Sequence, residues 1–146
     1  MAMLLSWQKE YMVGVPQIDK EHQYLFALIN EFHDKHASVA GPQRALAVLN
    51  RLVDYAKLHF RHEEELMLAM GYPLLPDQLD MHDKLYSSVS RLCQTLQADP
   101  SNLGPETIRF LKGWMIGHIV NEDMRIGDFL RDRVRQAQAS RETATA

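Results

Sequence analysis

Two residues of this chain, His59 and Glu63, have types and a spacing that suit metal binding. On a helix, residues four apart lie one turn above each other, so this imidazole and this carboxylate point the same way. Apolar neighbours recur at helical spacing and predict that this face points into a core: Leu52, Val53, Ala56, Phe60, Leu66 and Met67. A carboxylate in a core is costly unless it is paired or binds a metal ion. The pair therefore raises the question of whether other helices supply ligands at the same depth.

Further imidazole, amide and carboxylate side chains lie on the apolar stripes of three other stretches of helical pattern. They are His22, Gln78, His82, His118 and Asp123. Imidazole and carboxylate together favour iron, manganese or zinc over calcium or magnesium. Two carboxylates can also bridge and help to neutralise two ions. Because a single zinc ion needs only four ligands, four imidazoles and two carboxylates point to a pair of transition metal ions.

The elements that must position these residues are four amphipathic helices with an apolar period near 3.6. Gly41-Pro42 and Gly104-Pro105 open two of them, since proline is favoured at the first helical position. Gly71 ends another, and Asp19 suits an N-cap. We expect helices over residues 19–38, 42–70, 76–99 and 105–133, after an irregular arm (1–18) and before a flexible tail (136–146). The fold class is all-α, an up-down-up-down four-helix bundle over 19–135 within a single domain of 1–146.

This topology brings all of the candidate ligands to one end of the bundle, because neighbouring helices run in opposite directions. One spacing does not fit an ideal helix. His118 and Asp123 are five residues apart, which corresponds to about 140° around the axis. We therefore expect Asp123 to reach the site from the side, toward a neighbouring helix.

The composition excludes several classes of protein. The chain has 146 residues, a net charge of −3 and 46% hydrophobic residues, which gives no electrostatic case for nucleic acid or an anionic membrane as partner. No apolar run approaches the roughly 20 residues that span a bilayer, and the N-terminus lacks a signal-peptide pattern. The single Cys93 excludes an internal disulfide. These features predict a cytoplasmic location.

The ordered set of ligands resembles the hemerythrin family, and specifically its single-domain bacterial form, bacteriohemerythrin. The family's motif is His, then His-x3-Glu, His-x3-His and His-x4-Asp. This chain has His22, His59-x3-Glu63, Gln78-x3-His82 and His118-x4-Asp123. The surrounding sequence is also similar: Val13-Gly14-Val15 and Ile18-Asp19 before His22, Glu63-Glu64 and Leu66-Met67 after His59, Gly71-Tyr72-Pro73, and Trp114 before His118. The resemblance covers about residues 7–131.

This resemblance implies a non-heme di-iron centre that binds O2 reversibly, with an oxo or hydroxo group bridging two iron ions (Fe2+/Fe3+). It implies that His22 and His59 bind one iron, that His82 and His118 bind the other, and that Glu63 and Asp123 bridge them. An apolar pocket would keep water out. The candidates for its lining are Leu25, Phe26, Leu66, Met115 and Ile119.

Gln78 is the departure from the family pattern, because the family has a third histidine on the second iron at this position. An amide oxygen is a neutral and weaker donor than imidazole. Gln78 could ligate weakly through that oxygen, or step back so that water fills the position. A third reading leaves the second site partly empty. We favour the first two, because the other ligand positions are retained.

Three functions follow from these residues. The first is reversible O2 binding for transport, storage or sensing, without enzymatic turnover. The second is a di-iron oxidoreductase in which Gln78 opens reactivity toward peroxide or nitric oxide. The third is a metal-free bundle that serves only as packing or as a partner surface. The expected ligands are O2 and, as further candidates, peroxide, azide and nitric oxide.

Overall fold

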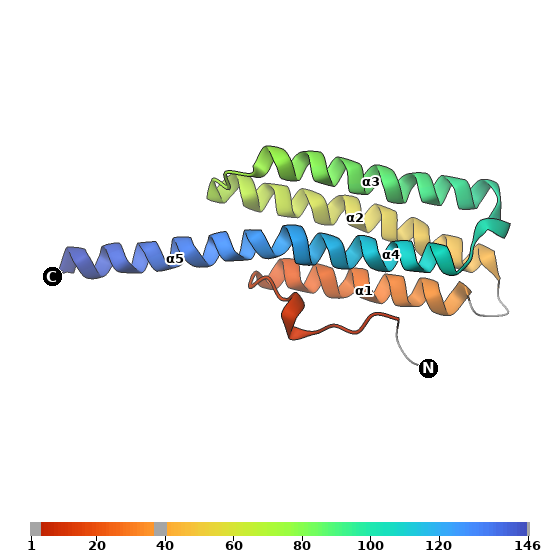
Figure 1. Ribbon diagram of the computed structural model, residues 1–146, viewed down its shortest axis with the longest axis horizontal. Coiled ribbons are helices and arrows are strands. Elements are labelled where there is room, and N and C mark those ends of the chain that lie inside the picture. The colour runs from red at the N-terminus through yellow and green to blue at the C-terminus, as the bar shows by residue number, and fades with distance from the viewer. Residues whose placement is uncertain (1–3, 37–40, 146) are drawn as a thin grey trace.

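A computed structural model of the chain describes residues 4–36 and 41–145 and contains helices and turns but no strand over those residues. The α-helices are α1 (Pro16–His36), α2 (Pro42–Met70), α3 (Leu75–Ala98), α4 (Pro105–Gly117) and α5 (Met124–Thr145). Two 3-10 turns are η1 (Lys9–Tyr11) and η2 (Pro100–Asn102), and a π-helical segment, η3 (His118–Asp123), joins α4 to α5. In Figure 1, α4, η3 and α5 run on as one rod beside the other three helices. The predicted all-α, up-down-up-down bundle is thus confirmed.

The helix ends lie where the turn residues predict. Pro42 and Pro105 stand in the first turn of α2 and α4, where the missing N–H is not needed. Gly71 ends α2 in the left-handed region, at φ 68°, and its N–H returns to the carbonyl of Leu68. The connection to α3 is therefore short, so α2 and α3 pack as antiparallel neighbours.

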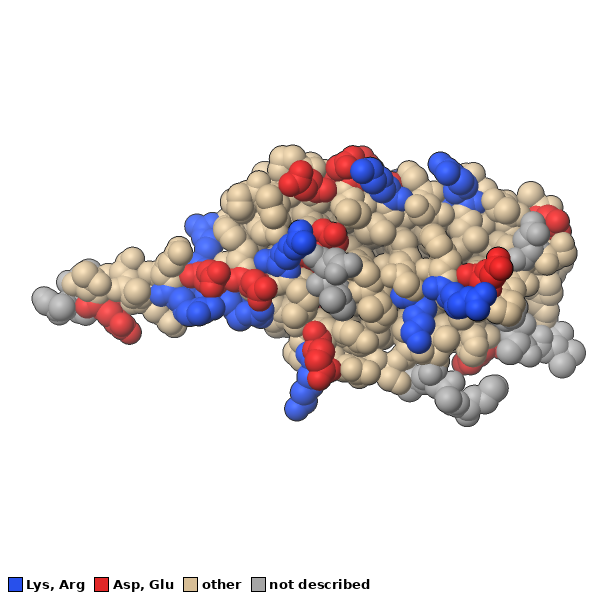
Figure 2. Space-filling model, in the orientation of Figure 1, with Lys and Arg blue, Asp and Glu red and all other residues tan. Residues whose placement is uncertain are grey.

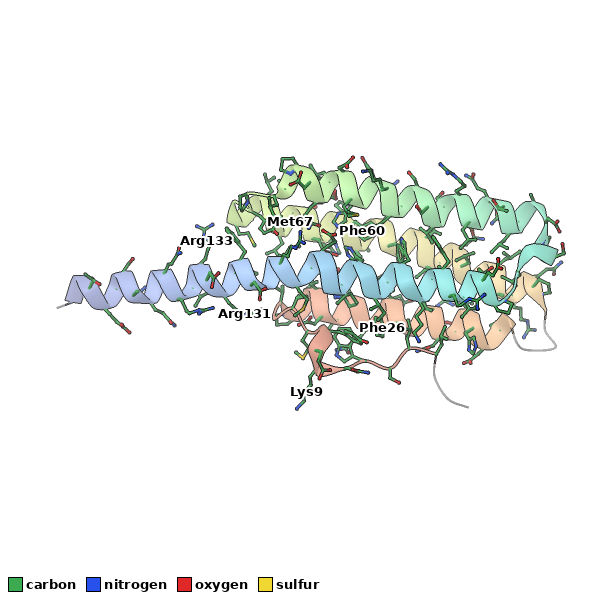
Figure 3. The ribbon with its side chains drawn as sticks, in the orientation of Figure 1. Lys9, Phe26, Phe60, Met67, Arg131 and Arg133 are labelled. Carbon is green, nitrogen blue, oxygen red and sulfur yellow. The ribbon has the colours of Figure 1, made fainter. Side chains whose placement is uncertain are left out.

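The buried apolar side chains form one large cluster along the axis of the bundle and a second, smaller cluster of Met67, Tyr72 and Ile126. The largest fully buried apolar side chains come from α1 to α4 and the π segment: Phe32, Leu25, Leu28, Ile29, Leu49, Leu52, Met67, Leu96, Leu111, Met115 and Ile119. Figure 3 shows Phe60 and Met67 between the helices. Helices α3 and α4 are linked by a hydrogen bond, which the indole N–H of Trp114 in α4 donates to the carbonyl of Leu85 in α3, at 3.1 Å.

The N-terminal arm packs against α1, as its apolar residues predict. Trp7 and Tyr11 meet Phe26 edge to face, with ring centres 5.2 and 5.6 Å apart. The prediction that Asp19 is an N-cap is wrong, because α1 begins three residues earlier, at Pro16. The Asp19 carboxylate instead accepts the N–H groups of Val13, at 2.8 Å, and Gly14, at 3.2 Å. It therefore fastens the arm to the bundle.

The C-terminal end is helical over residues predicted as a flexible tail (136–146). Helix α5 continues to Thr145 and projects beyond the bundle (Figure 1), and the flexibility of this segment stays a prediction. Residues 136–143 are exposed on every side, so this helix depends on good helix formers and on pairs such as Arg135 with Asp132, at 2.9 Å. Charges of both signs lie together along it (Figure 2), and Arg131 and Arg133 mark where it leaves the bundle (Figure 3). A polar composition excludes core packing but does not exclude a helix.

Gly127 is the point where α5 comes closest to the arm. A Cβ placed there would overlap the carbonyl oxygen of Val13 and lie 3.2 Å from its Cα. That arm cannot easily move aside, because Asp19 holds the N–H of Val13 and Arg131 donates to its carbonyl.

We therefore expect Gly127→Ala to lower the free energy of unfolding of the metal-free chain by about 1–3 kcal/mol. Gly113→Ala is the matched control, since it is an exposed helical glycine whose added Cβ meets nothing within 4 Å among the described residues. This control should gain about 0.5–1 kcal/mol. Urea unfolding followed by circular dichroism measures both, and equal stability of the two variants would contradict the close contact.

None of the helices in the described part of the chain is both long and apolar enough to cross a membrane.

Candidate metal centre

Five of the predicted ligands form one buried cluster. They are His22, His59, Glu63, His118 and Asp123, and each offers a ligand atom within 4.8 Å of the others. The side chains come from α1, from α2 and from the π segment, at the end of the bundle where α5 projects. All five are at most 2% exposed. The topology therefore brings together residues that lie up to 101 positions apart in the sequence, His22 and Asp123, as the antiparallel order predicts.

The two carboxylates occupy the middle of this cluster. Glu63 contacts the Nε2 atoms of His59 and His118, the latter at 3.0 Å. Asp123 lies 2.7 Å from Nε2 of His22 and 2.9 Å from Nε2 of His118. Each carboxylate thus meets imidazoles from two different elements, which is the placement of a group that bridges two ions.

The π segment corrects the prediction that Asp123 enters from the side. In η3 the hydrogen bonds close over five residues, as in the bond from the N–H of Met124 to the carbonyl of Ile119. One wider turn brings residues five apart onto one face, so both His118 and Asp123 point into the bundle. The spacing that did not fit an α-helix fits this turn, and such single π turns occur frequently at functional sites.

His59 is oriented by a carboxylate on the neighbouring helix. Its Nδ1–H donates to Oε1 of Glu21 at 2.7 Å, which leaves the Nε2 atom facing the cluster. Oε2 of the same carboxylate lies 2.5 Å from Nδ1 of His62, whose side chain is 28% exposed. His62 therefore contacts the carboxylate behind His59 and is not part of the cluster. Glu21 fixes the tautomer in which His59 offers a lone pair to a metal.

His82 and Gln78 complete the predicted set on α3, beside the cluster of five. The ring centre of His82 is 5.4 Å from that of His118, and its ring stacks on Phe60 at 4.3 Å and 12°. Both ring nitrogens are buried without a hydrogen-bond partner among the described residues. Gln78 is 2% exposed, and its Nε2 donates to Oε2 of Glu122 at 3.1 Å. Donor atoms for a second ion are thus present next to the first group.

Comparison with known proteins identifies the family of this chain. The sequence profile described as "Hemerythrin HHE cation binding domain" matches residues 13–130. The chain belongs to the hemerythrin family. It is 30% identical over 135 residues to a bacteriohemerythrin of Stenotrophomonas maltophilia, covering 91% of this chain and 86% of that protein.

Two further relatives agree with this membership in the hemerythrin family. A bacteriohemerythrin of Pseudomonas aeruginosa is 32% identical over 132 residues, which is 87% of this chain and 82% of that protein. The crystal structure of a wild-type hemerythrin superposes with a TM-score of 0.79 at 28% identity. That match covers 86% of this chain and 96% of the other. The likeness therefore extends over most of the chain.

The electrostatics of this hemerythrin-family site show why it needs cations. Burial opposes the charged form of His59, but the charge of Glu63 and the hydrogen bond from Glu21 raise its pKa to about 9. The pKa of His118 is also raised, against burial, by Asp123 and Glu63. Burial and the charge of Glu63 raise the pKa of Asp123. Without metal, protons on the imidazoles balance the carboxylates; metal ions would take their place.

His82 behaves differently from the other imidazoles. Burial lowers its pKa to about 4, so it is neutral near pH 7. A neutral imidazole with unpartnered nitrogens is ready to bind a metal without first losing a proton. The residues of this site are therefore better suited to binding two cations than to remaining metal-free.

The predicted pocket residues fall into two groups. Leu25, Phe26, Met115 and Ile119 are buried in the main core, whereas Leu66 is half-buried. Leu66 lines a small apolar space beside Glu63 and Asp123, which leaves no room for a water molecule. The other residues that line this space were not predicted from the sequence: Val13, Val15, Ile18 and Ile126. The arm thus shields the carboxylates on this side, which its apolar composition alone did not reveal.

Proposed function

We propose that this chain is a non-heme di-iron protein that binds O2 reversibly. The observation that carries the proposal is the buried group of three imidazoles and two carboxylates in a chain of the hemerythrin family. His22 and His59 would hold one iron, and His82 and His118 the other. Glu63 and Asp123 would bridge them, together with an oxo or hydroxo group. Two ferrous ions in such a site supply the electrons that O2 takes up on binding and gives back on release.

The protein's own residues support reversibility by excluding water beside the two carboxylates and by holding the imidazoles in place. Leu66 and the arm close the side of Glu63 and Asp123, and Phe60 stacks on His82. Glu21 holds His59 by its Nδ1 atom. Because charged groups in a water-free site interact strongly and relax little, such a site favours binding over side reactions. Transport, storage and sensing of O2 are all compatible with this chemistry, and peroxide, azide and nitric oxide are further candidate ligands.

The cytoplasm is the location that we propose with this function. The chain's single thiol, on Cys93, is buried and donates to the side chain of Asn50 at 3.0 Å. A thiol without a partner cysteine suits a reducing compartment.

Reconstitution with Fe(II) under argon tests the proposal. We expect two irons per chain and a visible absorption band that appears with O2 and disappears when O2 is removed, over several cycles. Azide added to the oxidised protein should give a separate band. Two irons with irreversible bleaching and turnover of peroxide would instead indicate an oxidoreductase, and no uptake of iron would contradict the proposal entirely.

A further inference from the structure

The side chain of Gln78 is buried in an unusual way, because only one end of its amide is satisfied. The side-chain nitrogen donates to Glu122 at 3.1 Å. The oxygen, Oε1, has no hydrogen-bond partner in the described part of the chain, although the residue is only 2% exposed. A buried oxygen without a partner is destabilising, so this arrangement favours a group that the oxygen can bind.

The contact with Glu122 fixes which end of the amide faces the metal centre. A carboxylate only accepts hydrogen bonds, so the NH2 group must be the end that faces Glu122. The oxygen then has to point elsewhere. Gln78 stands one turn before His82 on α3, so the two side chains share a face. The unpartnered oxygen is therefore carried by a side chain on the face of α3 that also holds His82.

Glu122 is placed for this contact by the π segment. It adjoins Asp123 in η3, and it reaches across to α3 while Asp123 turns into the cluster. Its side chain is half-buried, so it adds a partly desolvated negative charge beside the second site. A neutral amide oxygen is a weaker donor than imidazole, and a carboxylate bonded to the amide strengthens it by polarising the group.

We propose that Glu122 positions Gln78 so that Oε1 ligates the metal ion held by His82 and His118. This amide–carboxylate pair takes the place of the third imidazole of the second site. The inference rests on the proposed di-metal function and adds to it a ligand and a positioning residue.

Titration of the metal-free protein with Zn2+, which is redox-silent, tests the pair without any O2 chemistry. The wild type should bind two ions per chain. Gln78→Leu keeps the size of the side chain but removes the donor, and it should weaken one ion at least tenfold while leaving the other unchanged. Glu122→Ala should weaken the same ion roughly tenfold, the usual scale for a residue behind a ligand. Glu122→Gln retains an accepting oxygen and should fall between Glu122→Ala and the wild type.

The double variant Gln78→Leu/Glu122→Ala separates positioning from direct ligation. If Glu122 acts only through Gln78, the double variant binds the second ion no more weakly than Gln78→Leu alone. A further loss would show that Glu122 acts on the ion independently of Gln78 and would overturn the positioning role. Glu65→Gln, an exposed carboxylate on α2, is the matched control and should bind both ions as the wild type does.

The side-chain amide resonances of Gln78 provide a readout besides affinity. They are assigned by their loss in Gln78→Leu, and they should shift when the second equivalent of Zn2+ is added. Two bound ions with unmoved resonances would overturn the ligand role of Gln78 but leave the di-metal site intact. A wild type that binds fewer than two ions, with these resonances unmoved, would overturn both proposals.

Discussion

Glu63→Gln is expected to lower the affinity for both metal ions by more than roughly a hundredfold, while the metal-free chain remains folded. Loss of a residue behind a ligand already costs about 10–100-fold in affinity, and Glu63 lies between two imidazoles at the centre of the cluster. An amide of the same shape has one weak donor oxygen and no charge, so it cannot bridge two cations. Both ions should therefore be affected together.

The variant should still fold because the imidazole protons that balance the charge of the Glu63 carboxylate can dissociate when that carboxylate is replaced. Removing one partner of a buried ion pair is severe only when a charge is left behind. Here the partners are His59 and His118. Glu63 is the main group that raises the pKa of His59, so His59 can lose its proton instead, while Asp123 remains as the partner of His118.

Calorimetric titration with Zn2+ and iron content after reconstitution measure the loss, and thermal unfolding checks the fold. Glu65→Gln, two residues along the same helix and exposed, should match the wild type in all three measurements. Retention of two tightly bound ions by the Glu63 variant would refute the bridging role.

The stability of the metal-free chain is expected to decline as the pH rises from about 6.5 to above 9. The pKa of His59 in the folded protein is raised from 6.5 to about 9, so the folded state holds a proton that the unfolded chain has already released. The resulting stabilisation is complete below pH 6.5 and is lost as the pH passes 9. Its size is on the order of 3 kcal/mol for His59, and His118 acts in the same direction.

Below pH 6.5 the dependence of stability on pH has the opposite sign. His82 has its pKa lowered to about 4, so folding excludes a proton that the unfolded chain binds below 6.5, and stability falls as the pH drops through this range. Glu63 adds to this loss, since burial opposes its ionisation but His59 and His118 hold its pKa well below the usual value. The metal-free chain should therefore be most stable near pH 6–7.

Bound metal should remove the alkaline decline. A metal ion takes the place of the imidazole protons, so its binding releases protons and becomes stronger as the pH rises. Urea unfolding at several pH values, with a chelator and with Zn2+, gives both curves. Glu63→Gln should flatten the alkaline arm of the metal-free curve, because it removes the charge that raises these pKa values. A metal-free wild type that gains stability between pH 7 and 9 would disprove the assignment.

The order of the helices and the placement of most ligands could be predicted from the sequence, because both depend on local rules. A period near 3.6 marks a helix and its buried face, and prolines and glycines mark its ends. Since neighbouring helices run in opposite directions, the depth of His22, His59 and His118 follows from chain position alone. The ordered motif then predicted the family, which the comparisons confirm.

Other features could not be predicted because they depend on how distant segments meet. Glu21 reaches His59 across 38 residues, and Gln78 reaches Glu122 across 44. Which carboxylate stands behind which ligand depends on the rotation and relative height of two packed helices, and a periodic pattern leaves both undetermined within a turn. Asp19 looked like an N-cap for the same reason, since the sequence did not show that the arm would fold back onto it.

The sequence by itself determined the four helical stretches, the ends at Pro42, Gly71 and Pro105, and the set of candidate ligands, because each follows from residue type and spacing within one segment. Only the tertiary structure decided how His118 and Asp123 both point inward. The five-residue spacing of His118 and Asp123 is compatible with an Asp123 that approaches from the side or with a π turn. Packing against α1 and α2 favours the π turn. The same packing decided which end of the Gln78 amide has no hydrogen-bond partner among the described residues, since the other end donates to Glu122 of the π segment.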